Sequence, residues 1–474
     1  MLDNDRISKG NPYSNYLNSL SEAEKKKLGL VKRLLEIYTG NERLRNTLNI
    51  GIPIENIDKN FKGSGISLND VMPVIDSSII PSHFSQKEIK EKWPLVGLWL
   101  DYIDAAKAYR KYSIEIGSNY DIWPEFDKWR RRNINRVSIE MGAKSVGIIH
   151  PPIAFELSDG CSVGCWFCGI SAEKFKGHFE LTPENLREWK AIVNEAYSLL
   201  GSSMESSFLY WATDPLDNPD YLEFLETYTS IVDAIPQTTT AIALKNVDLT
   251  KSVLKFWEDK KTVPNRFSVL TTSILEKIHS NFNDEELLGV ELVLQNQGAL
   301  FTIKSASGKA LINEDEKVFF SESKKKKFES VDGGSTIACV SGFLINIVTK
   351  SIKLVSPTIA NDIWPNGYII FDEAKYDSPD QISKIMKSMI SKSSLEINAK
   401  KAIKIVANVE LQFENGMAFL KTPNLKREIK CSEKFIEYCN SGSHTPVDIV
   451  LMDDNKIKNF HLINFLWDNG LVET

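Results

Sequence analysis

The chain has 474 residues, 42% of them hydrophobic and 25% charged, proportions that are typical of an ordinary globular protein. A chain of this length predicts about two to four domains. The formal net charge of −6 argues against a general nucleic-acid binder. No apolar run approaches the roughly 20 residues that span a bilayer. The acidic N-terminus does not resemble a signal peptide, so we expect a cytoplasmic protein without a membrane partner.

Residues 1–150 are expected to form an N-terminal helical region. Ser21 and Glu24 have the spacing of a capping box, and the apolar residues that follow recur with a helical period. Pro73 is expected to interrupt the helical pattern. The basic run 130–132 has two interpretations: a solvated helix face, or a contact for an acidic peptide.

From residue 151 onwards, short apolar strands alternate with helices. The five strands expected up to residue 300 are 153–157, 207–211, 239–244, 266–270 and 288–294. Such alternation predicts βαβ units with parallel strands, and in barrels of such units the active site lies at the C-terminal ends of the strands. A hairpin over 343–355 and a strand from 368 are expected to complete this domain, which would end near residue 390. The lysine run 324–327 is interpreted as an exposed loop.

Three cysteines follow the first of these strands: Cys161, Cys165 and Cys168, which with the residues between them are called the thiol loop. Cysteine thiolates are the usual ligands of iron–sulfur clusters, normally four to a cluster. With only three, one iron would be open to a small molecule. A structural zinc site would need a second pair of ligands, which is missing nearby, and a disulfide is not expected without a secretory signal. The spacing therefore favours a cluster.

The pattern Cys-x3-Cys-x-aromatic-Cys, with Phe167 in the aromatic position, resembles the signature of the radical S-adenosylmethionine (radical SAM) enzymes. The resemblance implies a [4Fe-4S] cluster on Cys161, Cys165 and Cys168, and a partial (β/α)6 barrel. It also implies that the open iron chelates S-adenosylmethionine. One electron from a flavodoxin- or ferredoxin-type donor would then release a 5′-deoxyadenosyl radical, which abstracts a hydrogen atom. The hard chemistry would belong to the cofactor.

The ends of the expected strands supply candidates for contacts with S-adenosylmethionine. After the second strand, Ala212-Thr213-Asp214 stands where this family commonly has Gly-Gly-Glu, which binds the methionine amine. Asp214 offers a carboxylate one methylene shorter, and the loss of both glycines narrows the backbone options. A solvent-facing turn is the alternative, because Asp-Pro pairs are common in turns. The candidates for contacts with the ribose or the carboxylate are Lys245, Ser268 and Gln295.

Cys339 follows a glycine-rich segment and also has two interpretations. One is a small buried hydrophobe, as unpaired cysteines often are. The other is a hydrogen-atom donor, since the glycines let the backbone pass close to a ligand. A second cluster built from Cys339, Cys431 and Cys439 is a further alternative.

Residues 395–474 are expected to form a separate module, called the C-terminal module. Asn415-Gly416 between two apolar segments is a strong hairpin signal, and three helices are expected after it, which suggests a winged helix. Winged helices that read nucleic acid are usually basic, whereas this segment is mixed in charge. The alternative use of such a module is to pair an extended peptide against the hairpin edge.

Three phrases, 210–220, 337–342 and 364–373, resemble the radical SAM epimerases that mature ribosomally made peptides. The resemblance covers roughly residues 90–474. It implies that the radical takes the Cα hydrogen of an L-residue in a precursor peptide, and that a thiol returns a hydrogen to the opposite face, leaving a D-residue. Cys339, the only cysteine outside the thiol loop and the C-terminal module, is the expected donor. The module would be similar to a leader-peptide recognition element.

Two other functions stay open at this stage. One is a radical SAM enzyme that forms a carbon–carbon or thioether crosslink in a peptide. The other is not an enzyme: the three cysteines would be part of a zinc scaffold and the winged helix would be part of a DNA-binding regulator.

Overall fold

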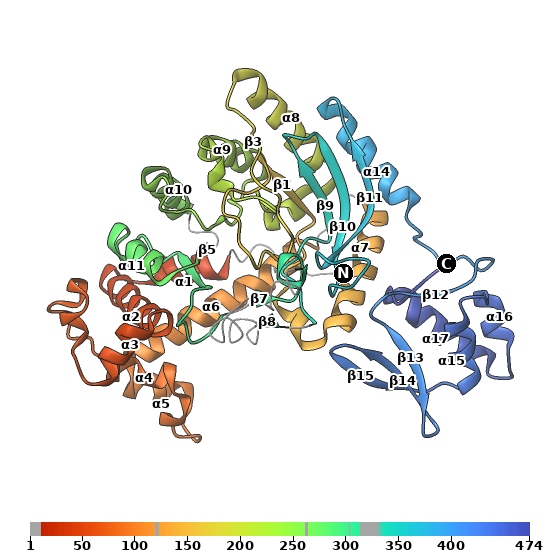
Figure 1. Cartoon of the computed structure of the whole chain (residues 1–474), viewed down its shortest axis with the longest axis horizontal. Coiled ribbons are helices and arrows are strands. Elements are labelled where there is room, and N and C mark those ends of the chain that lie inside the picture. Colours follow the sequence, from red (N-terminus) through yellow and green to blue (C-terminus); the bar gives the residue numbers. More distant parts are fainter. Residues whose placement is uncertain (1–10, 119–122, 261–263, 303, 313–330, 333) are drawn as a thin grey trace. The chain divides into compact units, whose positions relative to one another are not determined.

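The computed structural model describes residues 11–118, 123–260, 264–302, 304–312, 331–332 and 334–474 (Figure 1). The chain forms two compact units, each made of two stretches of sequence. Unit 1 comprises Met1–Ile116 and Asp214–Ile303, and unit 2 comprises Gly117–Thr213 and Lys304–Thr474. The expected division at residues 150 and 395 stays a prediction, and the lysine run 324–327 lies outside the described residues.

Unit 1 begins with helices, as the sequence predicts. They are α1 (Pro12–Ser19), α2 (Glu22–Gly40), α3 (Glu42–Asn49), α4 (Leu68–Ile75), α5 (Gln86–Lys92) and α6 (Pro94–Ile116). The capping box is confirmed, because the Ser21 N–H donates to the Glu24 carboxylate at 2.8 Å and the Glu24 N–H donates to Ser21 Oγ at 3.3 Å. The expected break at Pro73 is wrong. Pro73 lies inside α4, where it is buried together with Val71, and this packing offsets the missing hydrogen bond.

The second stretch of unit 1 carries a small parallel sheet. Its strands, in the order β4-β5-β6, are β4 (Thr239–Thr240), β5 (Asn265–Val269) and β6 (Val290–Leu294). They alternate with α9 (Tyr221–Val232), α10 (Val247–Lys260) and α11 (Thr272–Asn281). The predicted βαβ pattern of this stretch is therefore confirmed. Buried Arg33 of α2 binds the carboxylates of Asp58 and Asp284 at 2.6 and 3.2 Å, and so joins the helices to the second stretch.

Unit 2 contains a four-stranded mixed sheet in the order β1-β9-β10-β11. Its strands are β1 (Ile153–Glu156), β9 (Gly342–Asn346), β10 (Ser351–Pro357) and β11 (Tyr368–Lys375). β1 pairs in parallel with β9, and the other two pairs are antiparallel. The helices of this part are α7 (Pro124–Met141), α8 (Pro183–Leu200) and α14 (Ile382–Lys392), of which α8 and α14 lie beside the sheet in Figure 1. The described strands of the chain form no closed barrel, so the fold is mixed α/β and the partial barrel stays a prediction.

The expected strand 207–211 is wrong. It makes only one isolated bridge, between Phe208 and Ala154 of β1. Phe208 and Trp211 both enter the same apolar cluster around β1. Residues three apart point to opposite faces of a strand, so this packing is incompatible with an extended segment.

The C-terminal module contains the hairpin and the three helices that the sequence predicts. Its antiparallel sheet consists of β13 (Glu410–Glu414), β14 (Met417–Thr422) and β15 (Leu425–Ile429), and β12 (Lys404–Ile405) pairs with β16 (Val472–Glu473). The helices are α15 (Glu433–Ser441), α16 (Pro446–Leu451) and α17 (Lys456–Asp468). Asn415 and Gly416 turn the hairpin with φ of 52° and 79°.

The basic run on α7 is a solvated helix face only in part, and its contact with an acidic peptide stays a prediction. Arg130 is buried and donates to the His150 carbonyl. Arg132 lies 3.8 Å from the ring centroid of Trp467 and donates to the Trp467 carbonyl at 2.9 Å, so it fastens the C-terminal module to α7. Only Arg131 has the expected exposed position, paired with Asp127 at 2.7 Å.

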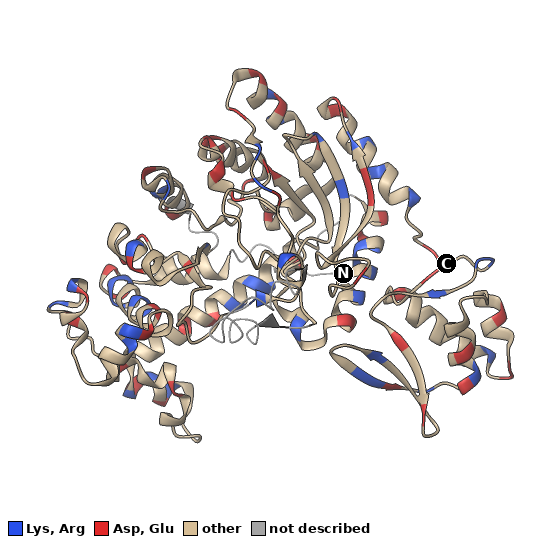
Figure 2. Cartoon of the chain, in the orientation of Figure 1, with Lys and Arg blue, Asp and Glu red and all other residues tan. Residues whose placement is uncertain are grey.

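Charges of both signs are interspersed along the described helices (Figure 2), in keeping with 57 basic and 63 acidic residues in the chain. Among the helices that the structure describes, none is both long enough and apolar enough to cross a membrane.

Candidate functional site

The thiol loop begins where β1 ends, in unit 2. After β1, the short strand β2 (Ser158–Asp159) pairs with β3 (Gly177–His178), and the Cys161 N–H donates to the Glu173 carbonyl at 2.9 Å. Gly160 has φ of 78°, and a Cβ at this position would overlap the carbonyl of Lys174. A glycine is therefore required directly before the first cysteine.

A segment from much later in the chain packs against the far end of the thiol loop. The Cys168 carbonyl accepts the Lys309 N–H at 2.9 Å, and a Cβ at Gly308 would overlap the same carbonyl oxygen. Cys168 Sγ accepts the Ala172 N–H at 3.3 Å. The sequence gives no signal for this packing, because the two segments are remote along the chain.

The donor set of the thiol loop fits an iron–sulfur cluster. Its three cysteines are half-buried, and none of the six cysteines, all of them described, forms a disulfide. A [4Fe-4S] cluster takes one cysteine at each ligated iron, so the thiols need not meet on one ion. No three His, Cys, Asp or Glu side chains of the described residues are placed to hold a single metal ion, as a zinc site requires. Beside the loop, Ser307 Oγ adjoins Gly169, is buried, and has no hydrogen-bond partner among the described residues, a costly state unless a ligand supplies one.

Phe167, the aromatic residue of the motif, contacts a buried lysine. Lys304 is buried, and its Nζ lies 5.1 Å from the ring centroid of Phe167 and 5.4 Å from that of Trp166. A cation over these rings is an attractive interaction. Sequence reasoning missed Lys304, which carries no motif of its own.

Ala212 is held by a carboxylate that the sequence did not single out. Glu156, the last residue of β1, accepts the Ala212 N–H at Oε1 over 2.7 Å and the Asn346 side-chain amide at Oε2 over 3.2 Å. Burial raises the pKa of Glu156, and the two hydrogen bonds offset part of this increase. The available signal was a glutamate inside an otherwise apolar strand. Thr213, the next residue, is half-buried at the end of this stretch of unit 2.

Asp214 begins the second stretch of unit 1 and is buried there. Its Oδ1 accepts the Leu216 N–H at 3.1 Å and the Thr240 hydroxyl at 2.7 Å, and its Oδ2 accepts the Ala241 N–H at 2.7 Å. Burial raises the pKa of Asp214 to about 6. The solvent-facing turn is therefore wrong, because this side chain holds the loop to the end of β4. Binding of the methionine amine by Asp214 stays a prediction.

The three remaining candidates lie in unit 1, at or just beyond the C-terminal ends of its parallel strands. Lys245 follows β4, and its Nζ lies 3.3 Å from buried Asp217 Oδ1. Ser268 is the fourth residue of β5, and Gln295 follows β6, where its N–H donates to the Val269 carbonyl at 2.9 Å. The structure thus brings the unit 1 candidates to one edge of one sheet. The thiol loop, Ala212, Thr213 and Cys339 belong to unit 2.

Cys339 lies three residues before β9 and is half-buried between two apolar clusters. One cluster surrounds Ala154 of β1 and the other includes Met141 of α7. A Cβ at Gly169, directly after the thiol loop, would lie 2.8 Å from Ile337 Cγ1. The thiol loop therefore ends against the segment that carries Cys339. Cys431 and Cys439 pack in the core of the C-terminal module, where burial raises their pKa to about 11 and about 12.

The fold and this site define a mixed α/β protein with a three-cysteine centre after a parallel strand. No family model matches the chain. It is 35% identical to "Uncharacterized protein y4wI" of Sinorhizobium fredii over 396 residues, which cover 82% of this chain and 75% of that protein. The chain belongs to the same family as y4wI. Among solved structures, BtrN in complex with AdoMet and 2-DOIA matches 32% of this chain and 58% of BtrN, with 15% identity and a TM-score of 0.24, too low to support a shared fold.

Proposed function

We propose that this protein is a radical SAM enzyme in which Cys161, Cys165 and Cys168 hold a [4Fe-4S] cluster. The observation that carries the proposal is the motif Cys-x3-Cys-x-Phe-Cys in a loop that follows the parallel strand β1 and the short strand β2. The packing of Lys309 and the nearby charge of Lys304 are consistent with a loop that holds a charged group. When bound, the cluster and S-adenosylmethionine would supply the one-electron chemistry that removes a hydrogen atom from a substrate.

The finer proposal is a peptide epimerase with Cys339 as the hydrogen-atom donor. The Cα–H bond of an L-residue would break, and its hydrogen would pass to the radical that S-adenosylmethionine supplies when bound. The S–H bond of Cys339 would then break as a new Cα–H bond forms on the opposite face. The sulfur then needs one electron and one proton, which an external flavodoxin- or ferredoxin-type donor and solvent supply. Two observations support this assignment: the apolar surroundings of half-buried Cys339, and the contact between Ile337 and the end of the thiol loop.

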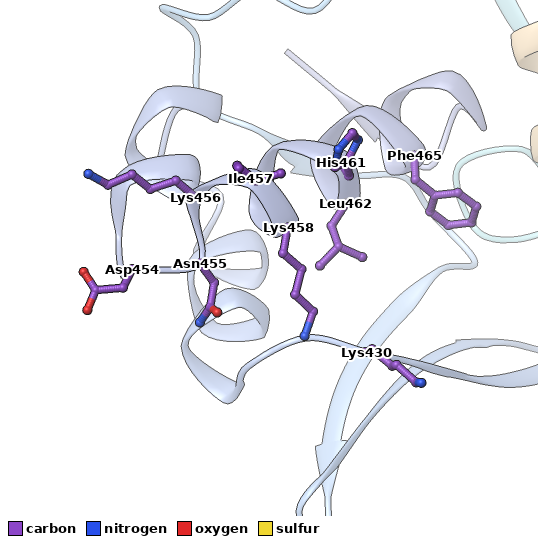
Figure 3. A pocket seen from close by; sticks show the side chains of 9 residues that line it. All are labelled: Lys430, Asp454, Asn455, Lys456, Ile457, Lys458, His461, Leu462 and Phe465. Atoms are coloured by element: carbon purple, nitrogen blue, oxygen red, sulfur yellow. The ribbon is translucent and has the colours of Figure 1, made fainter.

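We also propose that the C-terminal module binds the leader of the precursor peptide in a surface groove. The groove has a volume of about 870 Å³ and lies along α17 beside Lys430, which follows β15 (Figure 3). Its lining combines three lysines and one acid with polar and apolar side chains: Lys430, Lys456, Lys458, Asp454, Asn455, His461, Ile457, Leu462 and Phe465. Ile457 is 77% exposed and Phe465 is partly exposed, so the groove presents apolar surface to a ligand. A peptide segment with both apolar and acidic residues matches these surroundings.

Anaerobically prepared protein tests the first proposal. We expect about four irons and four sulfides per chain, and cleavage of S-adenosylmethionine to 5′-deoxyadenosine after reduction with dithionite. Protein without iron and sulfide would contradict it. Co-expression in D2O with short peptides encoded beside the gene then tests the finer one: each inverted residue gains one deuterium, whereas a crosslink loses two hydrogens. Loss of two hydrogens would favour the crosslinking alternative.

A further inference from the structure

Glu156 occupies the point where three segments of unit 2 meet. It ends β1, and its carboxylate reaches Ala212 on one side and Asn346, the last residue of β9, on the other. The same Asn346 amide donates to the Ser158 carbonyl at 3.0 Å, two residues further along the chain towards Cys161. We infer that Glu156 is a positioning residue for S-adenosylmethionine: it holds the Ala212-Thr213 segment in register with the start of the thiol loop.

The hydrogen bonds of Asn346 make this arrangement specific. Its Oδ1 accepts the Thr349 N–H at 2.9 Å, which orients the side chain so that its amide points at Glu156 and Ser158. The Ala212 N–H to Glu156 bond, at 2.7 Å, is at the short end of the usual range for N–H···O bonds. The segment after Phe208 is not held by a strand ladder, so this bond is what ties Ala212 to β1.

Glu156 is the one charged residue of β1. The neighbours Ile153, Ala154 and Phe155 are buried and apolar, and an uncharged residue at position 156 would avoid the desolvation penalty. Lys353, Asp159 and Tyr368 are the charged or titratable groups that interact with Glu156. Burial remains the largest influence on its pKa. Buried carboxyl groups with a raised pKa are concentrated at functional sites.

Asp214, the carboxylate chosen from sequence, differs from Glu156 in what its oxygens already bind. Three donors of unit 1 occupy it, whereas Glu156 accepts two hydrogen bonds and has more acceptor capacity left. The inference rests on the proposed binding of S-adenosylmethionine, and it adds a residue that holds the binding segment in place.

The test measures binding of S-adenosylmethionine by anaerobic protein with its cluster assembled. Glu156→Gln removes the charge, and Asn346→Ala removes the link to Ser158 while leaving Glu156 bonded to Ala212. Asp372→Asn is the matched control: it removes an acid of β11 in the same sheet, paired with Lys392 at 3.0 Å, and neither residue of that pair acts on Glu156. Iron content, melting temperature and the dissociation constant are measured for each variant. The EPR signal of the reduced cluster is also titrated with S-adenosylmethionine. The concentration at which half of the spectral change has occurred is the EPR half-shift concentration.

We expect Glu156→Gln to keep its iron and melting temperature while its dissociation constant and EPR half-shift concentration rise about tenfold. Asn346→Ala should raise both about threefold, and Asp372→Asn should match the wild type. Wild-type values in Glu156→Gln would overturn the inference. If that variant loses its iron, Asn346→Ala decides, and an unchanged constant overturns the inference equally. A wild-type protein that holds iron but never binds S-adenosylmethionine would instead overturn the proposed function.

Discussion

The thiol loop and the groove of the C-terminal module are built in opposite ways. Around the thiol loop, backbone hydrogen bonds from Glu173 and Lys309 and tightly packed glycines fix the chain. Along the groove, exposed side chains such as Ile457 carry the chemistry, and their backbone is an ordinary helix. The difference teaches that a reacting centre needs exact backbone placement, whereas recognition of a flexible peptide needs adaptable side chains. Substitutions that alter the backbone without removing a reactive side chain should therefore be harmful around the thiol loop and mild along the groove.

The largest effect is expected from Cys168→Ala. Loss of one of three ligands should abolish cluster assembly, and with it all cleavage of S-adenosylmethionine. Iron analysis after anaerobic reconstitution measures this. Cys439→Ala is the control, because Cys439 is buried in the core of the C-terminal module and should cost stability without costing iron. Full iron content in Cys168→Ala would show that Cys168 is not a cluster ligand, and the thiol loop could then not be compared with the groove as a reacting centre.

Cys339→Ala should separate hydrogen abstraction from hydrogen return. The variant lacks only the donor thiol, so we expect 5′-deoxyadenosine to form while the yield of D-residue falls at least about a hundredfold. Chiral amino-acid analysis of the hydrolysed peptide, together with chromatography of 5′-deoxyadenosine, measures both. Cys431→Ala should leave both unchanged. Normal epimerisation in Cys339→Ala would remove this residue from the mechanism.

A pair of glycine variants tests the role of backbone packing directly. Gly308 and Gly164 have φ of 58° and 65°, so alanine costs each about 1–2 kcal/mol of conformational energy. Only Gly308 also faces an obstacle, the Cys168 carbonyl, whereas nothing lies within 4 Å of a Cβ at Gly164. Gly308→Ala should therefore lose most of its iron on gel filtration, and Gly164→Ala should retain most of it. Equal retention would show that the packing against Cys168 is dispensable.

These examples show which features local sequence predicts. The capping box at Ser21, the parallel strands of unit 1 and the hairpin at Asn415 each depend on residues a few positions apart, and all three are confirmed. The packing of Lys309 on the thiol loop was not predictable, since its side chain bonds Ala172, 137 residues away. The strand expected at 207–211 failed for the same reason, because packing of Phe208 and Trp211 against distant residues overrides a local β pattern.

Asp214 extends the rule of backbone placement to unit 1, with a smaller expected effect. Its pKa rises from 3.8 to about 6 on folding, so between these values the folded protein binds more protons than the unfolded one. Its contribution to the free energy of unfolding is therefore greatest below pH 3.8 and falls by about 3 kcal/mol as the pH rises through 6. Asp214→Asn should lose this dependence, which urea unfolding of both proteins between pH 4 and about 7 measures as a difference. If the free energy of unfolding changed with pH in the same way in both proteins, folding would not raise the pKa of Asp214.

The smallest effect is expected in the groove. Phe465, a partly exposed side chain of α17, lines it, and Phe465→Ala should weaken binding of a leader-bearing precursor about tenfold, the usual scale for one aromatic contact. Lys458→Glu should weaken it similarly if the bound segment is acidic, and the loss should shrink at high salt. Fluorescence anisotropy with a labelled peptide measures both, and Lys387→Glu on α14, exposed and outside the groove lining, is the control. Peptide-free cleavage of S-adenosylmethionine should stay normal in all three variants. Loss of that cleavage in Phe465→Ala would show that the module supports the reacting centre as well, and the two regions would then not be separate in function.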